Sequence, residues 1–163
     1  MYYLKLFNKT LLGFDMDKEL NVSNIDILCD DIKLFPENLK EVNSESVKHF
    51  ILNKLIPKNR ANLECFLSAV NIELDDFKAI LDYSKGLSII DAYWITRDDE
   101  LRYEDFNLFD NEINEELSLA IFNGTKTNVN NTVLSPEFTT NGAIPKCWIK
   151  KDDGYYLYKS STA

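Results

Sequence analysis

The stretch that decides the C-terminal fold is Leu134 to Ala163, LSPEFTTNGAIPKCWIKKDDGYYLYKSSTA. Residues 143–159 read as two strands rich in β-branched and aromatic residues, with Asp152-Asp153-Gly154 between them as a turn. The glycine can take the positive φ that such a turn requires. Trp148 in the first strand is expected to be buried, so that Trp148→Ala would cost about 3–5 kcal/mol of stability.

Side chains of a strand alternate between its two faces, and this assigns the residues of the return strand. Tyr155, Leu157 and Lys159 fall on one face, and Tyr156 and Tyr158 fall on the other. The sequence therefore predicts a hairpin that presents aromatic side chains on both sides.

Working outward, the N-terminal end also alternates in the manner of strands. Tyr2–Phe7, Leu11–Met16 and Val22–Cys29 are short apolar runs separated by polar breaks, which predicts a small antiparallel meander over residues 1–31. Pro36 then begins a connecting turn or a single turn of helix.

The middle of the chain, residues 36–122, is predicted to be mainly helical. Apolar residues recur there at spacings of three and four, which is typical of helices with one buried face. The predicted helices start at Ser44 without a full capping box, at Arg60 or Asn62, near Asp75, and at Asn111 or Asn114. Residues 87–96 lack this period and predict a buried strand with Trp94 in the core. With the hairpin segment over 133–163, the prediction is one α+β domain spanning residues 1–163.

The formal net charge is −9, and most of the excess lies between Asp98 and Glu116, which holds nine carboxylates and one arginine. This surface would repel nucleic acid and attract a basic protein groove, or it is an ordinary solvated face. The acidic residues taken as candidates for binding a partner are Asp98, Asp99, Glu100, Glu104 and Asp105.

The residues that would support metal or cysteine chemistry are sparse. Cys29, Cys65 and Cys147 are far apart, and His49 is the only histidine. No spacing among them suits a zinc site or a nucleophile with its base, so neither a metal nor a cofactor is expected. The odd number of cysteines fits reduced thiols of a cytoplasmic protein, and no apolar run is long enough to cross a membrane.

Three runs in the C-terminal stretch resemble the region that leads into the kinase core of HipA-like serine/threonine kinases, a family of toxin-type kinases. They are Ser135–Gly142, Ile144–Trp148 and Tyr156–Lys159. The resemblance implies that this chain corresponds to the non-catalytic part upstream of the core, with the phosphate loop beginning around residues 160–162. Because the catalytic-loop Asp and Asn and the metal-binding Asp of such kinases are absent, the chain is not expected to be an enzyme.

Two functions remain open at this point. The first is a non-catalytic protein–protein interaction or regulatory module, in which Tyr155 and Leu157 of the hairpin join the acidic residues as candidate contacts. The alternative is an acidic inhibitor of the phage type, of the anti-CRISPR or nucleic-acid-mimic class, that blocks the basic groove of a nuclease. Both predict a protein partner, and neither predicts direct binding to nucleic acid or membrane.

Overall fold

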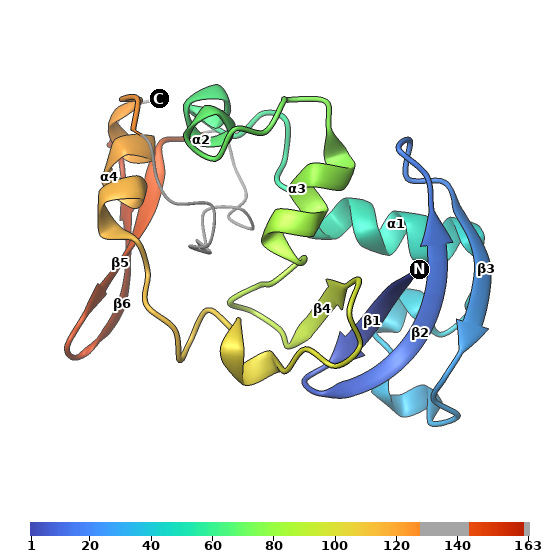
Figure 1. Cartoon of the computed structure of the whole chain (residues 1–163). Helices are drawn as coiled ribbons and strands as arrows, with labels where there is room; N and C mark the ends of the chain where they lie inside the picture. The colour runs from blue at the N-terminus through green and yellow to red at the C-terminus, as the bar shows by residue number, and fades with distance from the viewer. Residues whose placement is uncertain (128–143, 162–163) are drawn as a thin grey trace.

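A computed structural model of the chain describes residues 1–127 and 144–161. It has the predicted α+β class, with an antiparallel sheet, helices and a separate C-terminal hairpin (Figure 1). The elements are β1 (Tyr2–Leu6), β2 (Lys9–Met16), β3 (Val22–Ile27), single 3-10 turns η1 (Ile32–Leu34) and η2 (Glu37–Leu39), α1 (Ser44–Lys54), α2 (Leu63–Ala69), α3 (Phe77–Ser84), β4 (Tyr93–Thr96), η3 (Tyr103–Asp105), α4 (Glu115–Asn123), β5 (Lys146–Lys151) and β6 (Gly154–Lys159). The run Ser135–Gly142, and with it the start of the hairpin segment predicted over 133–163, lies outside the described residues.

The sheet has the order β3-β2-β1-β4, and all its neighbouring strands are antiparallel. Its first three strands are the predicted meander. β4 follows α3 in the chain and pairs with β1. In this pairing Leu4 lies opposite Ile95, and Lys5 lies opposite Trp94. Successive residues of a strand face opposite sides, so β1 and β4 contribute to two separate apolar layers.

The strand predicted over 87–96 is shorter than expected. Only residues 93–96 form β4, and the Ile90 side chain is 87% exposed. The reason is local hydrogen bonding. The Ser88 hydroxyl accepts from the Ile90 N–H, and the Asp91 carboxylate accepts from the Tyr93 N–H, which holds this segment in bends rather than in a ladder.

α1, α3 and α4 each begin at a side chain that accepts a hydrogen bond from a backbone N–H group of the first turn, whereas α2 begins at Asn62 without such a bond. The prediction that Ser44 caps α1 without a capping box was wrong. The cap is Asn43, whose Oδ1 accepts from the Ser46 N–H while the Ser46 Oγ accepts from the Asn43 N–H. Asn114 caps α4, and Gly124, with φ of 66°, ends it.

The main core lies between one face of the sheet and the helices. It contains Leu4, Phe14, Ile51 and Phe66, and it reaches Leu117 and Ile121 of α4. A smaller apolar cluster covers the opposite face, where Leu87, Trp94, Tyr103 and Leu108 pack together. Trp94 is therefore a core residue, as predicted, and is 0% exposed.

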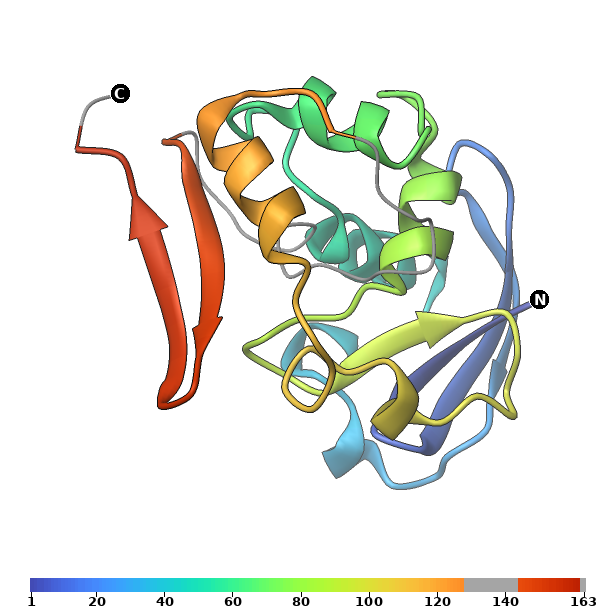
Figure 2. The ribbon, with the colours of Figure 1, turned by 60° about the vertical axis from the view of Figure 1, so that its left-hand side comes forward.

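The β5–β6 hairpin lies at the opposite end of the molecule from the sheet, beside α4 (Figures 1 and 2). Its strands pair without a register shift from Lys146 and Lys159 to Lys151 and Gly154, which has a φ of 151°. Cys147 and Ile149 are its buried apolar residues. Trp148 alternates with them and is only half-buried, so it is less buried than predicted.

None of the helices in the described ranges has the length and apolar character that crossing a membrane requires.

Candidate protein-interaction surface

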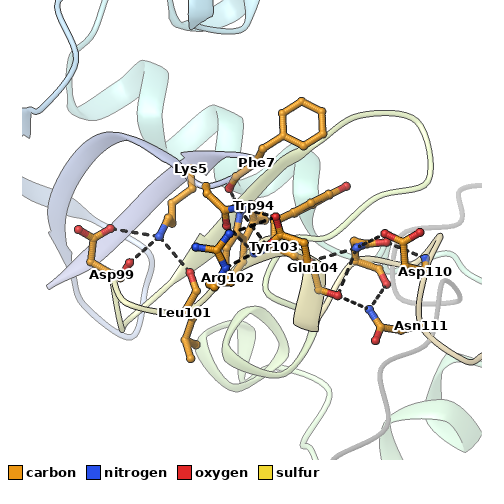
Figure 3. Close-up of polar contacts among 12 residues, drawn as sticks. Lys5, Phe7, Trp94, Asp99, Leu101, Arg102, Tyr103, Glu104, Asp110 and Asn111 are labelled. Carbon is orange, nitrogen blue, oxygen red and sulfur yellow. Dashed lines mark hydrogen bonds and ion pairs between the residues drawn. The ribbon is translucent and has the colours of Figure 1, made fainter.

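The segment of residues 98–111, here called the acidic layer, leaves β4 and runs back across β1 and the β1–β2 turn (Figure 3). Its anchor is Lys5, whose side chain is only 3% exposed. The Lys5 ammonium donates to the carbonyl oxygens of Asp99 at 2.5 Å and Leu101 at 3.1 Å. It also lies 3.4 Å from the Asp99 carboxylate and 5.6 Å from the centre of the Trp94 ring. One buried cation thus holds the start of the layer against the sheet.

The β1–β2 turn holds the middle of the layer. The Asn8 side chain accepts from the Tyr103 N–H at 2.8 Å and donates to the Glu104 carboxylate at 2.7 and 3.0 Å. The Tyr103 ring meets the Phe7 ring edge-on at 5.3 Å. Beneath them the Trp94 indole N–H donates to the Phe7 carbonyl at 2.7 Å. Polar contacts from Asn8 and aromatic contacts from Phe7 therefore hold Tyr103 and Glu104 against the β1–β2 turn.

The end of the layer is closed by asparagines. Asn107, which is 1% exposed, accepts from the N–H groups of Phe109 and Asp110 and donates to the Asp110 carboxylate at 2.9 Å. The Asn111 side chain donates to the carbonyl oxygens of Asn107 at 2.8 Å and Glu104 at 3.1 Å. These bonds satisfy backbone groups that have no ladder partner.

Three of the five predicted acidic residues use their carboxylates to build the layer. Asp98 accepts from the Glu100 N–H at 3.0 Å, Asp99 accepts from the Thr10 hydroxyl and pairs with Lys5, and Glu104 bonds Asn8. Hydrogen bonds from its own backbone N–H and from Asn8, together with the nearby Arg102, lower the pKa of Glu104. These carboxylates stabilise the fold.

Glu100 and Asp105 differ from the other three. Both are exposed, and within residues 1–127 and 144–161 their carboxylates make no hydrogen bond or ion pair. They project charge from a backbone that the neighbouring carboxylates hold in place. Glu100 and Asp105 are therefore the residues that remain available to a partner.

The two hairpin candidates are less accessible than predicted. The Tyr155 hydroxyl lies 2.9 Å from the Leu108 carbonyl oxygen and 2.8 Å from that of Phe109, so it ties β6 to the end of the acidic layer. Leu157 is half-buried and pairs with Trp148. The structure brings the hairpin and the layer together, but through an internal contact.

Sequence reasoning missed the residues that hold the layer, chiefly Lys5, Asn8 and Asn107. Lys5 lies in the run Tyr2–Phe7, for which only a strand was predicted, and nothing local signals that residues 99–101 fold over it. Asn107 carries a weak signal, since an asparagine side chain often accepts from the backbone two residues on in a turn.

A second polar feature is a pocket of about 280 Å³ between α1, η2 and the bends before β4. The Lys54 ammonium, with a side chain 8% exposed, lies there 2.5 Å from the Asp91 carboxylate and donates to the Tyr93 carbonyl at 3.1 Å. Burial lowers the pKa of Lys54, and Asp91 partly opposes this effect. The ammonium also lies over the rings of Phe50 and Tyr93, so it is already satisfied by the chain itself.

The acidic layer is suited to recognising positive charge. Among the described residues, no group of three or more His, Cys, Asp or Glu side chains is placed to hold a metal ion. What the surface offers is a fixed negative layer with two uncommitted carboxylates. The chain matches no known protein family, no curated protein and no solved structure.

Proposed function

We propose that this chain is a non-catalytic protein–protein interaction or regulatory module, similar to the N-terminal part of a HipA-like kinase, and that the acidic layer is its docking surface. The observation that carries the proposal is the pair of exposed, uncommitted carboxylates of Glu100 and Asp105 on a backbone fixed by Lys5 and Asn8. The partner presents a basic surface.

The physical support is preorganisation. A flexible acidic loop would lose conformational freedom on binding, whereas a layer already tied to the sheet loses little. Charges held at fixed positions also discriminate between partners by geometry and raise the rate of association. The separate β5–β6 hairpin supports the kinase-like interpretation, because two of the three runs that carry the resemblance contribute to its strands.

The second candidate is an acidic inhibitor that occupies a groove meant for nucleic acid. It is favoured by the concentration of nine carboxylates within residues 98–116 of a chain with net charge −9. The two candidates differ in the partner. The inhibitor binds a nuclease in competition with nucleic acid, whereas the module binds a protein that need not bind nucleic acid.

The test is affinity capture from a bacterial lysate followed by titration of the purified partner at low and high salt. The variant Glu100→Gln/Asp105→Asn removes the uncommitted charges without touching the bonds that hold the layer. The matched control, Glu41→Gln/Glu73→Gln, removes the same charge from exposed positions elsewhere. Affinity should fall steeply with salt and fall in the first variant only.

An unchanged, salt-insensitive affinity in the Glu100→Gln/Asp105→Asn variant would overturn the acidic layer as the docking surface. Displacement of the partner from DNA or RNA by the wild-type chain would favour the inhibitor over the module. A calorimetric titration with ATP and magnesium tests the non-catalytic assignment, since micromolar binding would contradict it.

A further inference from the structure

The outer edge of β6 is unpaired within the described residues. β5 lies next to α4 and β6 lies on the far side of β5, at the edge of the molecule (Figure 2). An exposed strand edge offers a row of free backbone N–H and C=O groups to another chain. A hairpin of two strands is also marginally stable by itself and gains from further strands.

Both edges of the N-terminal sheet, unlike the outer edge of β6, carry features that hinder pairing with another strand. At β3 the register with β2 shifts between Gly13 and Asp15, and Asn24 has a φ of 49°, so this edge is bulged. At β4 the Ile95 N–H donates to the Lys85 carbonyl at 2.7 Å, which covers part of that edge. Bulges and coverage are devices that block pairing with another strand. β6 pairs with β5 in a regular register, and no backbone hydrogen bond among residues 1–127 and 144–161 covers its outer edge.

The register of the hairpin shows which β6 groups point outward. Ser160 continues the ladder by donating its N–H to the Pro145 carbonyl at 2.9 Å. Backbone bonding alternates along an antiparallel strand, so even-numbered residues bond β5. The backbone groups of Tyr155, Leu157 and Lys159 therefore point away from β5.

We propose that two copies of this chain associate through their β6 strands, which run antiparallel about a twofold axis at Tyr156. This register places the outward groups of Tyr155 opposite those of Leu157 in the second copy. It forms one four-stranded sheet in the order β5-β6-β6-β5. The pairing uses the outer edge of the hairpin rather than the acidic layer, so it does not depend on the proposed function.

The side chains of β6 are complementary to themselves in this register. Gly154 faces Tyr158 of the second copy, and a Cβ built on Gly154 has no atom within 4 Å, so there is room for the ring. An aromatic residue opposite an edge glycine is a stabilising cross-strand pair. Tyr156 and Tyr158 are each 39% exposed, and pairing would cover them.

The charges also match. The same register sets exposed Asp153 opposite exposed Lys159 of the second copy, and the twofold axis repeats this pair. Opposite charges directly across neighbouring strands stabilise the pair, and like charges destabilise it. Because the net charge of −9 opposes association of two copies, the experiment is run at about 0.15 M salt, where separated charges are screened over about 8 Å.

The test is sedimentation equilibrium of the full chain and of two charge variants. Asp153→Lys and Lys159→Glu each replace both attractive pairs with repulsive ones, so each should weaken self-association about tenfold or more. An equimolar mixture of the two variants restores both attractive pairs in the heterodimer and should associate as tightly as wild type. Circular dichroism shows whether the variants keep their fold.

A covalent readout checks the register. Cα atoms of a pair that does not exchange backbone bonds lie about 4.5 Å apart, within reach of a disulfide. Tyr156→Cys should therefore cross-link to a second copy under mild oxidation, whereas Tyr158→Cys, placed opposite Gly154, should not exceed the wild-type background. A wild-type chain that stays monomeric at millimolar concentration, or a variant mixture that associates no better than each variant alone, would overturn the proposal.

Discussion

At the scale of single residues, the buried Lys54 shows how strongly one charge can depend on one partner. Asp91→Asn removes the carboxylate bonded to the Lys54 ammonium and leaves that ammonium in a site 8% exposed. We expect a loss of about 3 kcal/mol at pH 7, the usual result of removing one partner of a buried pair. Lys54→Met is the control, since it keeps the packing against Phe50 and leaves only Asp91, which water can reach. Urea unfolding of both variants measures the difference.

The pH dependence of the Asp91→Asn variant has a definite sign. Burial lowers the folded-state pKa of Lys54 below the unfolded value of 10.5, so the unfolded chain binds more protons between these two values. Stability from this group therefore rises with pH across that window. Without Asp91 the folded-state pKa of Lys54 falls further. The loss of unfolding free energy in the variant, relative to wild type, should therefore shrink as pH rises toward 10. A constant deficit would contradict this account.

Trp94 and Trp148 differ in burial, so replacing each with alanine should destabilise the fold by different amounts. Trp94 is fully buried, packs against Tyr103 and Phe106, and donates its indole N–H, so Trp94→Ala should lose about 3–5 kcal/mol. Trp148 is half-buried, and Trp148→Ala should lose only about 2 kcal/mol. Denaturant unfolding of the two alanine variants measures both losses of unfolding free energy. Equal losses would mean that Trp148 contributes more than its burial indicates.

At the scale of elements, Asn62 joins the start of α2 to the end of α4. It has φ of 59° in the left-handed region, and its side-chain amide donates to the Ile121 carbonyl at 2.7 Å. Asn62→Ala loses both the tolerance for positive φ and the bond, and should cost about 2 kcal/mol. Asn62→Gly keeps the backbone and should cost about 1 kcal/mol. If the alanine variant is no less stable than the glycine variant, the backbone part of this argument is wrong.

The elements show what could be predicted from the sequence. The meander, the helical stripes and the hairpin follow from periods of two and 3.6 residues, which are local properties. The start of β4 at Tyr93 rather than at residue 87 was missed because Ser88 and Asp91 compete for backbone bonds. The candidate surface was predicted by charge alone. Which carboxylates stay free depends on contacts from Lys5 and Asn8 more than ninety residues away in sequence, and no local pattern encodes them.

At the scale of the whole molecule, Lys5 links the sheet to the acidic layer. Lys5→Met keeps an apolar side chain beside Trp94 but removes two hydrogen bonds and the ion pair with Asp99. Hydrogen exchange should become faster at residues 99–104 while β2 and α1 stay protected, because Lys5 is not part of the main core. The control Lys9→Met removes an exposed lysine from the same hairpin. A uniform loss of protection would show instead that the layer and the core unfold together.

The same variant separates two explanations of partner binding. Both Lys5→Met and Lys9→Met make the net charge one unit more negative, from −9 to −10. If attraction to a basic partner depends on total charge alone, both variants should bind slightly more tightly. If it depends on Glu100 and Asp105 being held in place, Lys5→Met should bind more weakly while Lys9→Met does not, because only Lys5 anchors the layer. Titration of both variants against the captured partner at one salt concentration decides between these explanations, and equal affinities would remove preorganisation from the argument.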